Sequence, residues 1–168
     1  MLVAMAGLPK SGKTTFASRL KNVTLYSPDF SLPPDLSEAD EEEKKKQYRI
    51  AAWTVNLQAT STFIRKRGDE EVVVFDTTGS NASTMENLFD LCTAHDHRFL
   101  YLFIHDTMEH CIGRFAMVGK TKEETRQMMN DYRSKLLYCI AKFKSRMKIM
   151  KNDGSKEELE KQAEVFQT

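Results

Sequence analysis

The sequence predicts an α/β fold of three layers, in which a central parallel sheet of five strands lies between two layers of helices. Two observations predict it. Short apolar or β-branched runs recur along the chain at residues 2–6, 23–26, 71–75, 99–104 and 147–151. Between them lie longer stretches with helical spacing of apolar residues, and this alternation is typical of a parallel sheet covered on both faces. At 168 residues, we expect a single domain over residues 1–168.

The strongest local signal is the segment Gly-Leu-Pro-Lys-Ser-Gly-Lys-Thr at residues 7–14, which follows the first predicted strand. It fits the phosphate-binding template G-x-x-x-x-G-K-[ST] at every fixed position, so the fold class becomes that of the P-loop NTPases. Glycines let the backbone N–H groups of such a loop face a polyphosphate, and a helix predicted from Thr14 to Lys21 adds the positive end of its dipole.

These features predict ATP as the ligand of the loop. The ATP-binding residues are expected to be Gly7, Leu8, Pro9, Lys10, Ser11, Gly12, Lys13, Thr14 and Thr15. Lys13 is expected to bridge the β- and γ-phosphates and to act in catalysis, and the Thr14 hydroxyl is expected to ligate Mg²⁺.

The charge balance limits the class of partner. The chain has 25 basic and 24 acidic residues, a net charge of +1, whereas proteins that grip long duplex nucleic acid are usually strongly basic. A nucleic-acid partner is therefore expected to be held at an end or at one nucleotide. Residues 133–151 are dense in Lys and Arg, and we interpret them as the solvated face of a helix, with a local nucleic-acid patch as the alternative.

The sequence also predicts a cytoplasmic location. No apolar run approaches the roughly 20 residues of a membrane span, so no membrane partner is expected. Met1 leads directly into the first strand, which leaves no room for a signal peptide. Cys92, Cys111 and Cys139 are widely spaced without a C-x-x-C pair, which argues against disulfides or zinc and predicts buried or half-buried thiols.

Asp29 follows the second predicted strand, in the segment Ser27-Pro28-Asp29-Phe30. Ligands of parallel sheets bind at the carboxyl ends of the strands, so Asp29 is expected on the same rim as the loop 7–14. This makes it the first catalytic candidate. The alternative is a turn residue that caps its own backbone. Three prolines between residues 28 and 34 exclude a helix there.

A helix is predicted from residue 38 to about residue 67. Its acidic start and the lysines that follow suit the helix dipole, and we interpret them as a solvated helix start and not as a metal site. Ile50, Trp53 and Leu57 fall at helical spacing, and Trp53 is expected in the core and not as a base-stacking platform.

The run Val72-Val73-Val74-Phe75 predicts a buried parallel strand that delivers Asp76 to its carboxyl end. Together with the loop 7–14, this placement predicts that Asp76 holds Mg²⁺ directly or through water. The polar turn after it lies on the same rim, and Ser83 or Thr84 is expected to cap the next helix, which runs to about Ala94. His95-Asp96-His97 is interpreted as a surface turn.

The segment at about 114–125, between two later predicted helices, contains several basic residues. A kinase needs a mobile lid that excludes water and carries cations over the phosphates. Arg114 and Lys120 are therefore predicted to line a small helical lid and to act in catalysis, with Arg126 as a weaker candidate. The alternative is a solvated basic loop. After the helix from Lys122 to about Lys144, the turn at Asn152 is positioned to meet an adenine ring, and Ser155 begins the last helix.

In these motifs the sequence resembles the 5′-OH polynucleotide kinases, including the kinase modules of phage and bacterial RNA-repair enzymes. The likeness runs from residue 2 to about residue 140. Its carriers are the loop 7–14, Ser27 to Phe30, Ala51-Ala52-Trp53, Val73 to Gly79, and Cys111 to Arg114. The resemblance implies that Asp29 is the general base, that Lys13 and Thr14 hold ATP·Mg²⁺, and that Arg114 or Lys120 covers the phosphates.

The sequence departs from this family at the acceptor side. The arginine expected three positions after the general base falls at Leu32, the asparagine of a D-x-T-N turn falls at Gly79, and a further arginine falls near Met85. The expected activity is transfer of the ATP γ-phosphate to a hydroxyl of a polynucleotide or nucleotide. Phage-type phosphorylation of hydroxymethylated pyrimidines in DNA, a small-molecule kinase and a nucleotide-dependent switch or binding module remain alternatives.

Overall fold

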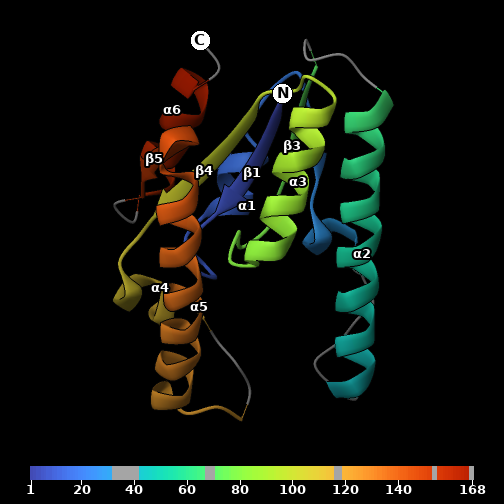
Figure 1. Ribbon diagram of the computed structural model, residues 1–168. Helices are drawn as coiled ribbons and strands as arrows, with labels where there is room; N and C mark the ends of the chain where they lie inside the picture. Colours follow the sequence, from blue (N-terminus) through green and yellow to red (C-terminus); the bar gives the residue numbers. More distant parts are fainter. Residues whose placement is uncertain (32–41, 67–70, 116–118, 153–154, 167–168) are drawn as a thin grey trace.

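One sheet of five parallel strands forms the centre of the protein in the computed structural model, which describes residues 1–31, 42–66, 71–115, 119–152 and 155–166 (Figure 1). The strands are β1 (Leu2–Ala6), β2 (Val23–Tyr26), β3 (Val72–Phe75), β4 (Phe99–His105) and β5 (Met147–Lys151), in the order β2-β3-β1-β4-β5. On β1, Ala4 pairs with Phe75 of β3 and Tyr101 of β4. The loop 7–14 therefore follows the central strand.

Helices cover both faces of the sheet, as the alternation of apolar runs predicts. The helices are α1 (Lys13–Ala17), α2 (Glu42–Lys66), α3 (Ala82–Ala94), α4 (Met108–Arg114), α5 (Lys122–Phe143) and α6 (Lys156–Phe166), with short 3-10 turns η1 (Pro28–Ser31) and η2 (Lys144–Arg146). Alternate residues of β1 enter two cores. Leu2 and Ala4 pack with residues of α2, α3 and α5, whereas Val3 and Met5 pack with residues of α1 and α6.

The three-layer α/β architecture with a parallel five-stranded sheet is confirmed, and local boundaries differ from the predictions. Helix α1 ends at Ala17 and not at Lys21, and Asn22 turns the chain toward β2 with a φ of 56°. Helix α3 is capped by Asn81, whose Oδ1 accepts a hydrogen bond from the Thr84 N–H at 3.0 Å. The prediction of Ser83 or Thr84 as the cap was wrong because Thr84 already lies in the first turn.

Other local features agree with the predictions in part. All three cysteines are free and buried, as expected. The segment 95–97 forms a turn in which Asp96 has a φ of 55°, but His97 is buried and does not lie on the surface. Among the described residues, no helix combines the length and the apolar composition that crossing a membrane requires.

Some predictions fall on residues outside the described ranges. These are the start of the helix at 38–41, the proline-rich segment with Leu32, the stop at residues 67–68, part of the expected lid at 116–118, and the turn residues 153–154.

Candidate functional site

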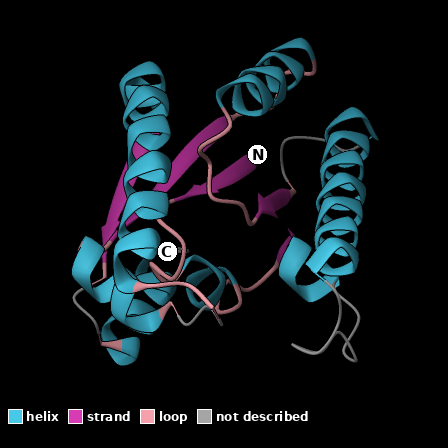
Figure 2. Ribbon diagram, turned by 90° about the horizontal axis from the view of Figure 1, so that it is seen from below, coloured by secondary structure: helices cyan, strands magenta, loops and turns pink. Residues whose placement is uncertain are grey.

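A cavity of about 1430 Å³ opens at the carboxyl edge of the sheet. Figure 2 looks at the protein from this side, with the long helices α2 and α5 on opposite sides of the view. The N-terminal turns of both helices extend beyond the edge of the sheet (Figure 1). Residues of the loop 7–14, of the turns after β2 and β3, and of α2 and α5 line the cavity together. The sheet thus delivers the predicted site residues to one space between two helical walls.

The backbone of the loop 7–14 is irregular and has positive φ angles at Lys10 and Gly12. Lys10 has a φ of 66°, and Gly12 caps α1 in the left-handed region with a φ of 97°. A Cβ on Gly12 would lie 2.8 Å from both the Asn152 Nδ2 and the Leu159 Cδ2 atoms, so a side chain there would displace both in addition to straining the backbone. Asn152 Nδ2 also donates to the Ser11 carbonyl at 2.9 Å. Asn152, expected beside an adenine ring, lines the cavity and braces the loop.

Lys13 is buried beneath the loop and lines the cavity, and its ammonium donates to the Leu8 carbonyl at 2.7 Å. Burial lowers the pKa of Lys13 from 10.5 to about 8, and the carboxylates of Asp76 and Asp29 oppose this decrease. A buried cation that is only partly compensated is a binding site for further negative charge.

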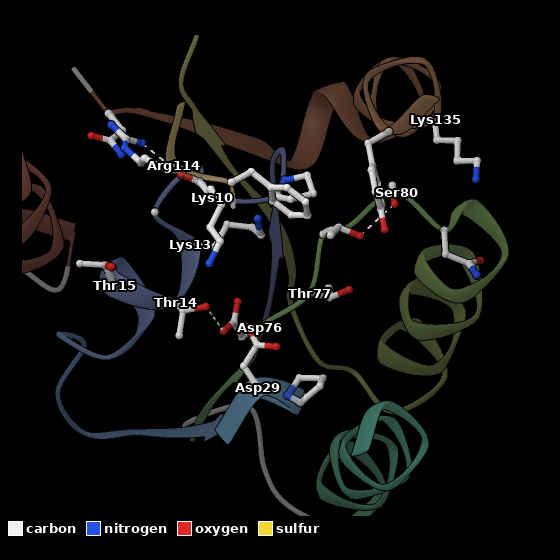
Figure 3. A pocket seen from close by; sticks show the side chains of 18 of the residues that line it. Lys10, Lys13, Thr14, Thr15, Asp29, Asp76, Thr77, Ser80, Arg114 and Lys135 are labelled. Carbon is white, nitrogen blue, oxygen red and sulfur yellow. Dashed lines mark hydrogen bonds between the residues drawn. The ribbon is translucent and has the colours of Figure 1, made fainter. Parts of the chain in front are cut away.

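Asp76 lies at the centre of a buried hydrogen-bond cluster at the end of β3 (Figure 3). Its Oδ2 accepts hydrogen bonds from the hydroxyls of Thr14 and Ser27, each at 2.8 Å. Burial raises the pKa of Asp76, whereas the two hydroxyls and the Lys13 ammonium act in the opposite direction. The structure thus brings both predicted metal ligands together. Ser27 is a member that the sequence did not single out.

The oxygen donors of this cluster fit Mg²⁺. Mg²⁺ binds one or two protein oxygens together with phosphates and water, and so needs no cage of protein ligands. Thr14 and Asp76 supply such an oxygen pair. Within the described parts of the chain, no group of three or more His, Cys, Asp and Glu side chains is placed to hold a metal, so a closed structural metal site is absent there.

Asp29 lies in η1, exposed to the cavity, and Figure 3 places it beside Asp76 and Thr14. The two ends of its turn are fixed. Ser27 bonds to Asp76, and Ser31 Oγ accepts a hydrogen bond from Asn56 Nδ2 of α2 at 2.7 Å. No described residue donates a hydrogen bond to the Asp29 carboxylate, so the alternative of a side chain that caps its own backbone is not observed.

Arg114 ends α4 and is held against the loop 7–14. Its Nη1 donates to the Lys10 carbonyl at 3.1 Å and to the carboxylate of Asp106. Asp106 follows β4 directly and is buried, and its other oxygen accepts from the Thr107 N–H at 2.7 Å. Sequence reasoning missed Asp106, although it follows an apolar strand just as Asp76 does.

The other two residues predicted for the lid, Lys120 and Arg126, do not line the cavity. Lys120 is exposed and does not line the cavity, and the Arg126 guanidinium pairs with Glu109 at 2.7 Å. Residues 116–118 of the expected lid lie outside the described ranges. A role of Lys120 over the phosphates therefore stays a prediction.

Two departures from the polynucleotide kinase pattern have steric causes. At Gly79, with a φ of 65°, an added Cβ would lie 2.5 Å from the Ala6 Cβ, so the asparagine of the D-x-T-N turn has no room. Met85 is buried in the core, so an arginine in its place would not reach the cavity as a solvated cation. Any acceptor contacts must come from other residues.

The central parallel sheet, the loop 7–14 after its middle strand and the carboxylate after β3 define a P-loop kinase fold. Solved structures of similar fold agree. Kti12 of Chaetomium thermophilum, in complex with ADP-AlF3, is 15% identical and has a TM-score of 0.55, over 99% of this chain and 97% of that one. A gluconokinase of Sinorhizobium meliloti 1021 is 15% identical with a TM-score of 0.56, over 96% and 87%.

A third neighbour, the shikimate kinase of Aquifex aeolicus vf5, is 18% identical with a TM-score of 0.57, over 98% of this chain and 95% of that one. No protein-family model and no curated protein sequence matches this chain. At these identities the likeness establishes the fold.

Proposed function

We propose that this protein is an ATP-dependent phosphotransferase that moves the γ-phosphate to a hydroxyl of a polynucleotide or nucleotide. The observation that carries the proposal is the shared cavity. The buried ammonium of Lys13 and the exposed carboxylate of Asp29 line the same space, and this space continues past them between α2 and α5. A phosphate cradle, a base and room for an alcohol are the parts that phosphoryl transfer requires.

The reaction needs few groups of the protein. The oxygen of the acceptor hydroxyl forms a bond to the γ-phosphorus while Asp29 accepts the proton of that hydroxyl. The bond between the γ-phosphorus and the β–γ bridging oxygen breaks, which releases ADP. Lys13 and Arg114 stabilise the negative charge that the phosphate oxygens carry during transfer. Asp106 holds the Arg114 guanidinium in place for this task.

Mg²⁺, when bound with ATP, supplies further positive charge to the β- and γ-phosphates. The residues that would hold it are Thr14 and Asp76, whose oxygens are already 2.8 Å apart. The Ser27 hydroxyl donates to the same Asp76 oxygen as Thr14 and helps to fix the orientation of the carboxylate.

Nucleotide binding is supported by the neighbour Kti12, a complex with ADP-AlF3, and transfer to an alcohol by the gluconokinase and shikimate kinase neighbours. The latter two also favour the second candidate, a small-molecule kinase. Transfer to a hydroxymethylated pyrimidine in DNA and a nucleotide-dependent switch without an acceptor are the remaining alternatives. We place the enzyme in the cytoplasm, where ATP is available.

A panel of acceptors tests the proposal. Radiolabelled ATP and Mg²⁺ are offered with 5′-hydroxyl oligonucleotides of DNA and RNA, oligonucleotides with hydroxymethylated pyrimidines, free nucleosides, gluconate and shikimate. We expect label to move to a nucleic-acid or nucleotide acceptor. Transfer to gluconate or shikimate alone would establish the small-molecule kinase instead, and ATP hydrolysis that no acceptor stimulates would favour the switch.

The pKa of Lys13 predicts how ATP binding depends on pH. In the free protein this pKa is about 8, and a bound triphosphate raises it because negative charge favours the protonated amine. At pH 8.5, ATP binding should therefore take up a large part of one proton, and affinity should fall as pH rises above 8. Calorimetry in two buffers with different ionisation enthalpies measures this uptake. A proton uptake that persists in Lys13→Met would show that another group titrates.

A further inference from the structure

Cationic side chains outnumber carboxylates around the cavity. Two carboxylates, Asp29 and Asp76, line it, and the cationic side chains that line it are Lys10, Lys13, Arg49, Arg114, Lys135 and Lys156. The whole chain has a net charge of only +1. The cations are therefore concentrated in this cavity, where they attract anionic ligands.

Four of these cations surround the loop 7–14. Lys10 and Lys13 belong to it, Arg114 donates to its backbone, and Lys156 is on α6, whose Leu159 lies against Gly12. The other two come from the walls, Arg49 from α2 and Lys135 from α5. In Figure 3, Lys135 lies on the far side of the cavity from Arg114 and Lys10, beyond Ser80. These two cations thus belong to the helical walls of the cavity and not to the surroundings of the loop 7–14.

Arg49 and Lys135 have no ion pair or hydrogen bond with any described residue. Two other cations of α5, which do not line the cavity, are paired: Arg126 with Glu109 and Lys142 with Glu86. In the described ranges of the chain, these two cations have counter-ions and Lys135 has none. An unpaired guanidinium and an unpaired ammonium that line one cavity fit phosphate oxygens.

An aromatic residue shares the helix face of each of the two cations. Trp53 follows Arg49 by four residues on α2, and Tyr132 precedes Lys135 by three on α5, so each pair occupies one face of its helix. Both rings are half-buried and line the cavity. Trp53, predicted as a core residue, packs against the core with part of its surface and faces the cavity with the rest. A cation next to an aromatic ring suits a phosphate next to a nucleobase.

We propose that Arg49, Trp53, Tyr132 and Lys135 form an acceptor subsite for a substrate that carries both a phosphate group and an aromatic base. This subsite rests on the proposed phosphotransferase function and names the class of its acceptor. The two cations bind phosphate oxygens and the two rings stack on bases, which leaves the hydroxyl of the acceptor beside Asp29. The subsite supplies the acceptor contacts that Gly79 and Met85 do not provide.

The chain offers a direct probe, because Trp53 is its only tryptophan. With the nucleotide site saturated by ADP·Mg²⁺, a nucleoside 3′-monophosphate or a short 5′-hydroxyl oligonucleotide should quench the Trp53 fluorescence. We expect the free nucleoside to bind at least about 10-fold more weakly, since it lacks the charge-assisted hydrogen bonds of the phosphate, which are among the stronger polar contacts. Arg49→Ala and Lys135→Ala should each remove most of this preference without changing the affinity for ADP. If Arg49→Ala and Lys135→Ala lose affinity for the oligonucleotide but keep their affinity for the mononucleotide, the acceptor is a nucleic-acid end.

Lys46→Ala on α2 and Arg133→Ala on α5 are the matched controls, since both side chains are exposed and neither lines the cavity. In steady-state transfer, the phosphate on the acceptor should raise kcat/KM by lowering KM, and Arg49→Ala or Lys135→Ala should lose this advantage while both controls keep it. Equal binding of nucleoside and nucleotide, or an equal loss in the control variants, would overturn the subsite. Phosphate-dependent quenching without any phosphate transfer would overturn the proposed function and leave the subsite standing.

Discussion

Replacing Lys13 by methionine is expected to lower kcat/KM for ATP by about 10³-fold or more, while the nucleotide-free protein stays at least as stable as the wild type. The loss follows because this ammonium is the buried cation of the loop 7–14 and stabilises charge on the transferring phosphate. Methionine fills a similar volume without charge. Lys66→Met, at the exposed end of α2, is a control that should change neither property.

The difference in free energy of unfolding between the wild type and Lys13→Met should depend on pH. The pKa of Lys13 is about 8 in the folded protein and 10.5 in an unfolded chain. Between these values the unfolded chain binds a proton that the folded chain lacks, so the free energy of unfolding of the wild type rises with pH relative to that of Lys13→Met. The rise should reach roughly 3 kcal/mol over this window. Urea unfolding of both proteins from pH 7 to pH 10 measures it, and a constant difference would contradict a desolvated Lys13.

Replacing Asp29 by asparagine should lower kcat by about 10²–10⁴-fold, the usual contribution of a general base. The position of Asp29 predicts that the substitution lowers kcat without changing the fold or ATP binding. Asp29 is exposed in η1, and no described residue donates a hydrogen bond to it, so the substitution breaks no contact of the fold. The Kd for ATP should change by less than about twofold, because the loop 7–14 keeps its cations.

Single-turnover transfer with the best acceptor, beside equilibrium binding of ATP, separates these two quantities. Asp90→Asn, an exposed carboxylate of α3 outside the cavity, is the matched control. Turnover of Asp29→Asn equal to that of the wild type would remove Asp29 from the reaction. A parallel loss of ATP affinity would instead assign Asp29 to nucleotide binding.

The sequence predicted the parts of the fold that depend on local pattern. The strands could be found because each is a short apolar run, and the loop 7–14 because its template fixes four residues at set spacing. Asp76 and Asp29 were found as carboxylates after strands. The same rule applied to β4 would have found Asp106. The sequence did point to Arg114, eight residues further along the chain, but not to its pairing with Asp106.

Contacts between distant segments could not be predicted from the sequence. The bond from Asn56 to Ser31, which fixes the turn of Asp29, depends on how α2 packs beside η1. Trp53 was assigned to the core because helical spacing does not reveal that α2 extends beyond the sheet. Lys135 was one base among many in residues 133–151, and only the cavity distinguishes it from the solvated ones.

The most direct test is a crystal structure of the protein with Mg²⁺ and a non-hydrolysable ATP analogue. We expect the triphosphate on the backbone amides of residues 7–14 and the Lys13 ammonium against the β- and γ-phosphates. The Asp29 carboxylate should face the γ-phosphorus from the side opposite the β-phosphate. A nucleotide bound elsewhere, or an Asp29 carboxylate turned away from the γ-phosphate, would contradict this expectation.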